Sequence, residues 1–344
     1  MPYQREYAKT LNIAVVGVGN HSYRNLIPAL HYLPVRLVAV CDINEDLVRR
    51  TAAQFGCRHY TSTREMYDKE SLDAVFLCVS AKLHPQLTIE AFQAGLHVWM
   101  EKPASLRSHE VENMIHHRGD KVAVVGFKKA FMPSTEKAIE VIQSEQYGNL
   151  QSILAIYPMS IPDNGQEVLE SGAFINWLAN GCHPLSLMLA TGGKVSSVTM
   201  HRDRNGRGIC MLEYANGTTG NFHFASGPQP SEVYHFYGEN WHLTIDNSLR
   251  VVLQRGIPFT YNKTFNYVPA GTESGAIVWE PQNCLATLEN KALFTQGIYG
   301  ELQYFCDCVL NRQAAERGSL EFALEVMKVY EAALISRGRR IDLD

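Results

Sequence analysis

Glu101 and Lys102 are residues whose types and position point to chemistry. They close the stretch HVWMEKP, in which Val98 to Met100 predict a buried strand. Pro103 restricts Lys102 to an extended or turn conformation because the proline ring crowds the preceding residue. In an open parallel sheet, ligands bind beyond the carboxyl ends of the strands. Lys102 is thus a candidate to face a ligand, although this stretch alone favours a surface Glu-Lys pair at an ordinary strand end.

A glycine pair near the start of the sequence predicts a phosphate-binding turn. In NIAVVGVGNHSYRNL, an apolar run of strand type leads through Gly17 and Gly19 into a stretch compatible with a helix. Gly17 permits a tight turn, and Gly19 lets the backbone approach a pyrophosphate at the helix N-terminus. Asn20 and His21 follow and belong to the expected cofactor residues, while a serine replaces the third glycine of the dinucleotide fingerprint.

The acid that ends the next apolar run favours NAD as the cofactor. VRLVAVCD predicts a second strand that ends in Asp42, about where an acid accepts hydrogen bonds from the ribose hydroxyls. A carboxylate there repels the 2′-phosphate of NADP, and no arginine immediately follows, so NADP is the less expected cofactor. The alternative places Asp42 in the turn before a helix that begins near Glu45, and both interpretations can hold together.

Further apolar runs continue an alternation of strands and helices. DAVFLCVS predicts a third strand that ends in Ser80, an expected cofactor residue, and a helix follows around residues 87–95. HVWMEKP then supplies the fourth strand. An alternating β/α series implies a parallel, doubly wound sheet of the α/β class.

Composition and charge exclude several function classes. The 344 residues exceed the size at which one hydrophobic core usually keeps growing, which predicts two domains. A formal net charge of -4 without a long Lys/Arg block argues against a nucleic-acid or anionic-membrane partner. No apolar run approaches the length of a membrane span. The polar amino-terminal residues lack the apolar segment of a secretory signal, so we expect a cytoplasmic protein.

The eight cysteines predict neither a disulfide framework nor a metal site, because they are scattered without the required spacing. Cys182, next to His183, raises the alternative of a nucleophile beside a base. Adjacent helix residues point in different directions, however, so a buried structural thiol is the expected state of Cys182.

These stretches together resemble the glucose-fructose oxidoreductase and inositol dehydrogenase family, also called Gfo/Idh/MocA. The resemblance rests on GVG, the strand-ending Asp42, SAKLHPQLTIEAFQAGLHVWMEKP, VVGFKKAFMPSTEKAIEVIQSEQYGNL and the closing ISRGRRIDL. It implies a dinucleotide-binding Rossmann domain over residues 1–125. Over residues 126–344 it implies a substrate-binding and oligomerisation α+β domain with a large open, mainly antiparallel sheet. The resemblance also implies a homodimer or homotetramer.

The second half of the sequence carries patterns that fit such a sheet. The expected elements are strands within 195–203, 208–226 and 232–246, and helices over 299–311 and 318–336. Asn216-Gly217 and Gly238-Glu239-Asn240 supply turn residues for hairpins. The connection over residues 255–296 is a candidate for a loop that covers the substrate pocket.

The resemblance assigns two residues to proton transfer. In the family, the lysine of EKP lies near the nicotinamide and hydrogen-bonds the reacting hydroxyl, and Lys102 matches it. A second motif, Asp-x-Gly-x-His, supplies a histidine that matches His183, but Ala179 replaces the aspartate. Asn176 and Asn180 share a helical face with Ala179 and His183, and their amides carry no compensating charge. We therefore expect a histidine that is harder to protonate, with Lys102 carrying more of the proton transfer.

Further residues complete the expected site. His84 aligns with a family histidine close to the cofactor, where Glu101 is also expected; helix capping or packing is the alternative for His84. Lys128, in GFKKAF, occupies the stretch where the family often has an arginine near the substrate, and a solvated basic turn is the alternative. Trp177 is a candidate for stacking on a sugar face, with a core tryptophan as the alternative.

The resemblance and the residues together imply an NAD-dependent dehydrogenase. The expected reaction moves hydride between NAD and a secondary alcohol of a sugar, glycoside or cyclitol, while Lys102, assisted by His183, takes the hydroxyl proton. One alternative is an NAD-retaining lyase or hydrolase that modifies glycosides through transient sugar oxidation. The other is a dinucleotide-binding sensor that retains the fold without the reaction.

Overall fold

The computed structural model describes residues 6–225, 227–228, 231–256, 261–263, 275–280 and 291–343. They belong to two compact units. Unit 1 consists of Met1–Phe131, Ser171–Phe174 and Ala292–Lys328, and unit 2 of Met132–Glu170, Ile175–Lys291 and Val329–Asp344. The functional boundary expected between residues 125 and 126 stays a prediction, and the units are described separately.

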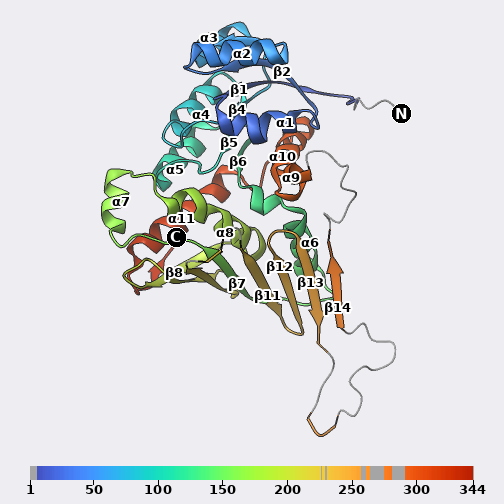
Figure 1. Ribbon diagram of the computed structural model, residues 1–344, viewed down its shortest axis with the longest axis vertical. Coiled ribbons are helices and arrows are strands. Elements are labelled where there is room, and N and C mark those ends of the chain that lie inside the picture. Colours follow the sequence, from blue (N-terminus) through green and yellow to red (C-terminus); the bar gives the residue numbers. More distant parts are fainter. Residues whose placement is uncertain are drawn as a thin grey trace. The chain divides into compact units, whose positions relative to one another are not determined.

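A parallel six-stranded sheet forms the centre of unit 1 in the described part of the chain (Figure 1). Its strand order, β3-β2-β1-β4-β5-β6, is that of the doubly wound Rossmann fold. The strands are β1 (Leu11–Val16), β2 (Val35–Cys41), β3 (Arg58–Tyr60), β4 (Ala74–Leu77), β5 (His97–Glu101) and β6 (Ala123–Gly126). This confirms the predicted fold class of the amino-terminal part.

The helices of unit 1 follow the strands as the sequence predicts. They are η1 (Ser22–Leu26, a π-helix), α1 (Ile27–Leu30), α2 (Glu45–Phe55), α3 (Thr63–Lys69), α4 (His84–Gln93), α5 (Ser108–His117), the 3-10 turn η2 (Lys128–Phe131), α9 (Lys291–Thr295) and α10 (Ile298–Asn311). The local sequence sets the ends of α2. Asn44 caps it by accepting a hydrogen bond from the Leu47 N–H at 3.0 Å, and Gly56 ends it in the left-handed region.

One strand of the sheet has no counterpart in the sequence prediction. β3 is the polar segment Arg58-His59-Tyr60, and no residue in it is fully buried, so it gives no apolar signal. HVWMEKP is therefore the fifth strand along the chain, not the fourth.

The core of unit 1 is completed by a helix from late in the sequence. α10 packs on β5, β6 and η2, and its Leu302, Phe305 and Cys306 are fully buried. Phe305 meets Phe76 of β4 edge-on at a ring-centroid distance of 5.5 Å. The apolar residues of α10 recur at helical spacing, which explains why this face is buried.

Unit 2 contains a mixed nine-stranded sheet in its described part, with the order β14-β13-β12-β11-β7-β10-β9-β8-β15. β7 and β10 are parallel, and the other described pairs are antiparallel. The strands are β7 (Leu150–Pro158), β8 (Val195–Arg202), β9 (Gly208–Tyr214), β10 (Thr219–Ala225), β11 (Val233–Gly238), β12 (Trp241–Asp246), β13 (Arg250–Arg255), β14 (Gly275–Trp279) and β15 (Ile341–Asp342). The predicted, mainly antiparallel sheet is confirmed.

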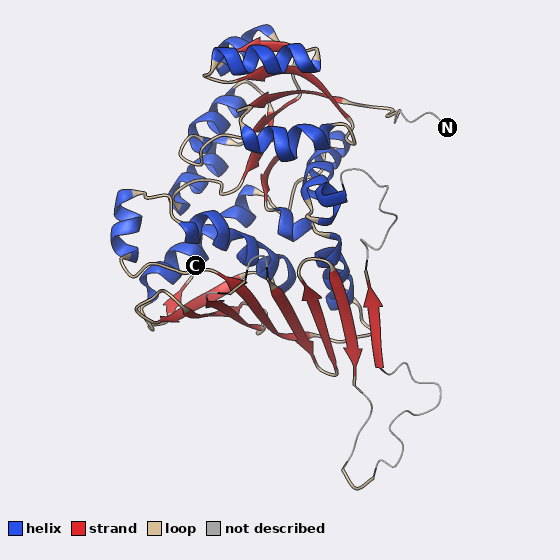
Figure 2. Cartoon of the chain, viewed as in Figure 1, coloured by secondary structure: helices blue, strands red, loops and turns tan. Residues whose placement is uncertain are grey.

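Helices pack on this sheet, as Figure 2 shows in blue and red. They are α6 (Pro133–Gln143), α8 (Asn176–Gly192) and the end of α11 (Leu320–Ser336), which begins in unit 1. α7 (Gly165–Ser171) instead packs against α11, where Gly165 lies close to the Leu334 carbonyl. α8 contacts β7 and α6, and α6 contacts β12 and β13. In the part of the chain that the structure describes, no helix has both the length and the apolar character to cross a bilayer.

The predicted hairpins and the predicted loop have different outcomes. The β9–β10 turn contains Gly217 with φ +88°, and its N–H donates to Tyr214 O at 3.0 Å. Of the connection 255–296, residues 275–279 form the edge strand β14, which the loop prediction missed. Residues 257–260, 264–274 and 281–290 lie outside the described residues, so the prediction of a covering loop falls on them.

Candidate active site

The two predicted glycines of the loop after β1 have different surroundings. Gly17 has φ +85°, and a Cβ there would lie 2.2 Å from the backbone oxygen of Cys78. At Gly19, no atom of the described residues lies within 4 Å of an added Cβ, and Gly19 and Asn20 are exposed. The loop is thus fixed at Gly17 by close packing and open at Gly19, which fits the approach of a pyrophosphate to the backbone.

Asp42 connects this loop with the start of α2. Its Oδ2 accepts a hydrogen bond from the Val18 N–H at 2.9 Å, and its Oδ1 accepts one from the Asn44 N–H at 2.9 Å. The acid therefore lies in the turn before the helix and beside the glycine loop, so the two interpretations from the sequence are compatible. Ile43, the next residue, is 95% exposed and offers an apolar surface next to the carboxylate.

Two other predicted cofactor residues are in direct contact. His21 Nε2 lies 2.7 Å from Glu101 Oε1, and Glu101 Oε2 accepts a hydrogen bond from the Lys102 N–H at 3.1 Å. His21 comes from the loop after β1 and Glu101 from the end of β5. This contact therefore joins the glycine loop to the EKP motif and fixes the backbone that carries Lys102.

His84 is a buried residue that hydrogen-bonds the backbone of the EKP motif. It begins α4 and is completely buried, and its Nδ1–H donates to the Pro103 carbonyl at 2.9 Å. Burial lowers the pKa of His84, so the neutral ring is favoured. This contact fits the packing alternative for His84. Ser80, after β4, is exposed, and its carbonyl accepts a bond from the Leu83 N–H at 2.8 Å in the turn before α4.

Lys128 opens η2 and is held by a residue that precedes α10. Its Nζ donates to Gln296 Oε1 at 2.9 Å, and burial lowers the pKa of Lys128. The neighbouring Lys129 is 7% exposed. A freely solvated basic turn therefore does not describe this segment.

In unit 2, the predicted substrate residues lie on the first turns of α8. Asn176 and Asn180 are exposed, and the Asn180 amide donates to Asn176 Oδ1. His183, one turn further along, is 7% exposed. Pro184 has no N–H to donate to the Asn180 carbonyl, so this helix carries an extra acceptor near the two amides.

Trp177 does not present its ring for stacking on a sugar. The side chain is fully buried, its Nε1–H donates to Tyr330 O at 3.2 Å, and it stacks on Phe222 at a centroid distance of 5.8 Å. A Cβ at Gly181 would lie 2.1 Å from the indole, so Gly181 makes room for this packing. The sugar-stacking interpretation is corrected: Trp177 is a core tryptophan. Cys182 is buried, as expected for a structural thiol.

Asn176 also lines a cavity of about 430 Å³ in unit 2. Ser160, Asp163, Arg204 and Asn205 line the same space, together with the apolar Ile161, Pro162 and Ile175, so a mainly apolar lining carries a few hydrogen-bonding groups.

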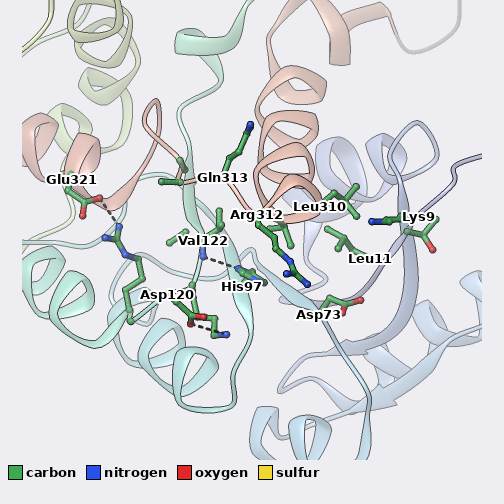
Figure 3. Close-up of a pocket in the computed structure, with 18 residues that line it drawn as sticks. Lys9, Leu11, Asp73, His97, Asp120, Val122, Leu310, Arg312, Gln313 and Glu321 are labelled. Carbon is green, nitrogen blue, oxygen red and sulfur yellow. Dashed lines mark hydrogen bonds and ion pairs between the residues drawn. The ribbon is translucent and has the colours of Figure 1, made fainter.

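A second cavity, of about 1140 Å³, lies in unit 1 away from the predicted residues (Figure 3). Leu11 and His97 begin β1 and β5, so this space is at the amino edge of the sheet, whereas Rossmann ligands bind at the carboxyl edge. Its charges include paired groups: Arg118 with Glu321 at 2.7 Å and Lys121 with Asp120 at 3.1 Å. We therefore assign no cofactor role to it.

Sequence reasoning missed two residues of this region. Ile43 has a signal in the sequence, since a large apolar residue directly follows the acid that ends a strand. Glu301 lies among the apolar residues of α10 and is 1% exposed, beside the Lys102 and Lys128 charges. A single acid at core-facing helical spacing is the signal that would have identified it.

Comparisons with known proteins agree with this geometry. Residues 11–129 match the model of GFO_IDH_MocA, described as an oxidoreductase family with an NAD-binding Rossmann fold. The chain is 27% identical over 147 residues to a myo-inositol 2-dehydrogenase of Thermotoga maritima, covering 40% of this chain and 42% of that protein. It is 27% identical over 221 residues to a D-xylose 1-dehydrogenase (NADP(+)) of Haloferax volcanii, covering 60% and 66%. The chain thus spans less than two thirds of the length of either relative.

A solved structure extends the likeness in fold across nearly the whole chain. An oxidoreductase from Agrobacterium radiobacter, in complex with NAD+, L-tartaric acid and magnesium, has a TM-score of 0.78 at 16% identity and covers 97% of this chain and 98% of that one. The glycine loop, Asp42 and the open space at Gly19 fit the dinucleotide that the matched family binds. The resemblance to the glucose-fructose oxidoreductase and inositol dehydrogenase family is therefore confirmed, and residues 11–129 form an NAD-binding Rossmann domain of these oxidoreductases.

Proposed function

We propose that this protein is an NAD-dependent dehydrogenase that moves hydride between the nicotinamide and a secondary alcohol of a sugar, glycoside or cyclitol. The observation that carries the proposal is the link between Glu101 and His21, because it joins the phosphate-binding loop to the lysine motif within one unit. The sugar and inositol dehydrogenases among the relatives support this substrate class.

The cofactor residues of the proposal are Gly17, Gly19, Asn20, His21, Asp42, Ser80, His84, Glu101 and Lys102. Bound NAD would supply the hydride acceptor. Gly19 leaves room for the pyrophosphate, and the Asp42 carboxylate binds ribose hydroxyls and repels a 2′-phosphate, which favours NAD over NADP. His84 acts from the core by fixing the Pro103 carbonyl.

Lys102 and His183 carry the proton transfer in this proposal. Lys102 Nζ takes the hydroxyl proton of the substrate when hydride leaves its carbon, and His183 assists. Ala179, in place of the family's aspartate, leaves His183 without that carboxylate partner, so Lys102 bears the larger share. Lys128, Asn176 and Asn180 bind the substrate; the cavity that Asn176 lines supports this role for Asn176.

The test is a spectrophotometric screen of the purified protein with NAD and a panel of cyclitols, aldoses and glucosides, following formation of reduced nicotinamide. Accumulation of NADH with a polyol supports the dehydrogenase. Release of a glycosidic substituent without NADH would instead establish the NAD-retaining lyase or hydrolase. Binding of NAD without change in any substrate would establish a sensor. Light scattering of the same preparation tests the proposed homodimer or homotetramer.

A further inference from the structure

Glu101 uses both of its carboxylate oxygens within the protein. Oε1 lies 2.7 Å from His21 Nε2, and Oε2 accepts the Lys102 N–H at 3.1 Å. A carboxylate only accepts hydrogen bonds, so His21 Nε2 carries the hydrogen of this contact. β5 ends at Glu101, which places the Lys102 N–H beyond the last residue of the strand. The direction in which the chain leaves the sheet at Lys102 therefore depends on where this carboxylate lies.

The backbone that follows Lys102 has a separate anchor. His84, which is completely buried, donates to the Pro103 carbonyl at 2.9 Å. On the other side of Lys102 the anchor is more open, since the side chain of Glu101 is 15% exposed and that of His21 is 52% exposed. The His21 anchor therefore lies where a bound ligand can reach it, whereas the His84 anchor is closed off from the surface.

His21 is held by the phosphate-binding loop through the two residues that follow it. Ser22, which replaces the third glycine of the fingerprint, donates from Oγ to the Gly17 carbonyl. The Tyr23 N–H donates to the Gly19 carbonyl at 3.2 Å. A change of the loop at the exposed Gly19 therefore displaces the imidazole of His21 as well.

We propose that His21 is a positioning residue that couples the phosphate-binding loop to the backbone of Lys102, so that NAD in the loop sets the direction of the lysine. The chain of contacts starts at the loop, passes through His21 and Glu101, and ends at the Lys102 N–H. This inference deepens the proposed function and rests on it for the place of NAD and the role of Lys102. The alcohol then meets a correctly placed base only after NAD has bound.

The first test follows the exchange of the Lys102 amide hydrogen by mass spectrometry with residue-level fragmentation. In the free protein, His21→Leu should speed this exchange about threefold or more, because the Glu101 acceptor is no longer held in place. In the wild type, saturating NAD should slow the exchange, and in His21→Leu it should not. Unchanged exchange in the free variant, or equal slowing by NAD in both proteins, overturns the proposal.

A conservative variant separates the hydrogen bond from the bulk of the side chain. In His21→Gln an amide N–H takes the place of the Nε2–H, so the exchange of the Lys102 amide should stay within about twofold of the wild type. His109→Leu is the matched control, because His109 is exposed on α5 in the same unit. If His21→Gln behaves like His21→Leu, the hydrogen bond is not the cause and the proposal fails.

The wild type alone provides a test that remains decisive if His21→Leu does not fold. The exchange of its Lys102 amide is measured without NAD and with NAD at a concentration that calorimetry shows to be saturating. Slower exchange with NAD is the expected result. If bound NAD leaves the exchange unchanged, the loop and the lysine are not coupled and the proposal is wrong.

Steady-state kinetics test whether this positioning matters for turnover. At saturating NAD, His21→Leu should lower kcat for alcohol oxidation about tenfold and change KM for the alcohol less than about twofold, because Lys102 acts on the bound substrate. His21→Gln should recover kcat. An unchanged kcat in His21→Leu, or a loss that His21→Gln does not recover, overturns the positioning role. A wild type without dehydrogenase activity contradicts the proposed function instead, while the exchange measurements still decide whether His21 holds Lys102.

Discussion

The Asp42 carboxylate accepts the Val18 N–H at 2.9 Å, so the acid at the end of β2 is fixed to the loop between the two glycines. A single side chain thus connects the expected pyrophosphate and ribose contacts. Its other oxygen, Oδ1, accepts a hydrogen bond from the N–H of Asn44, the residue that caps α2. In the proposed function, the choice of cofactor and the local loop geometry therefore depend on the same carboxylate.

Replacing Asp42 by Ala should weaken NAD binding and reduce the preference for NAD over NADP. We expect the ratio of kcat/KM for NAD to that for NADP to fall about tenfold or more, since hydrogen bonds to a charged group contribute about 1.5–3 kcal/mol. Asp46→Ala is the control, because Asp46 is exposed on α2 and pairs with Arg49. An unchanged ratio would show that Asp42 does not select the cofactor.

Lys102→Met should cut turnover at least about a hundredfold, because the variant lacks the proposed general base. NAD binding should persist, because the glycine loop is unchanged. Steady-state kinetics and calorimetric NAD titration check the two parts. Lys69→Met, which changes an exposed lysine paired with Glu65 on α3, should leave both unchanged. Near-normal turnover in Lys102→Met contradicts the role proposed for this residue.

Variants of the two loop glycines distinguish an effect on the free energy of unfolding from an effect on NAD binding. Gly17→Ala should destabilise the protein by about 1–3 kcal/mol, because the new Cβ meets the Cys78 carbonyl. Gly19→Ala should leave the free energy of unfolding within about 0.5 kcal/mol, because the space beside it is open, but should weaken NAD binding. Urea denaturation and NAD titration of both variants measure these effects. Normal NAD affinity in Gly19→Ala would remove Gly19 from the site.

His84 should make stability fall under mildly acidic conditions. Burial lowers its pKa, so the unfolded chain takes up a proton below 6.5 that the native state refuses, and the free energy of unfolding decreases as pH falls. His84 can change the free energy of unfolding by at most about 1.4 kcal/mol per pH unit. His84→Asn should reduce the slope measured by denaturation, whereas His109→Asn, at an exposed position of α5, should not. If the free energy of unfolding depends equally on pH in the wild type and in His84→Asn, His84 is not the cause of the acid-induced loss of stability.

Asn176→Ala should raise KM for the substrate about tenfold with little change in NAD affinity. The reason is that the Asn176 amide lines the cavity of about 430 Å³ in unit 2, whereas the described cofactor loop belongs to unit 1. A substrate titration at saturating NAD measures the effect. The matched substitution, Asn205→Ala, changes another residue of the same wall and tests whether the whole cavity or only Asn176 contributes. An unchanged KM in both variants excludes the cavity.

Local patterns account for what was predictable from the sequence. Gly17, Asp42 and Lys102 each lie at the end of an apolar strand, so periodicity alone placed them at the carboxyl edge of one sheet. The sequence did not predict β3, because its three polar residues give no such apolar pattern. Short elements of this kind are specified by their neighbours in the sheet.

Burial accounts for what could not be predicted. α8 is apolar around most of its circumference, so helical spacing did not reveal that Trp177 faces the core and Asn176 does not. The environment of Glu301 depends on Gly126, far away in the sequence, and no local window contains both residues.

α10 also has a consequence for biosynthesis. The amino-terminal sheet presents Phe76 and Trp99 to a helix that the ribosome makes almost last. A nascent chain released after residue 131 would keep this apolar face open to water, and chaperones or aggregation would compete for it. Attempts to express the nucleotide-binding part separately should therefore include residues 292–311, for example by grafting them through a short linker.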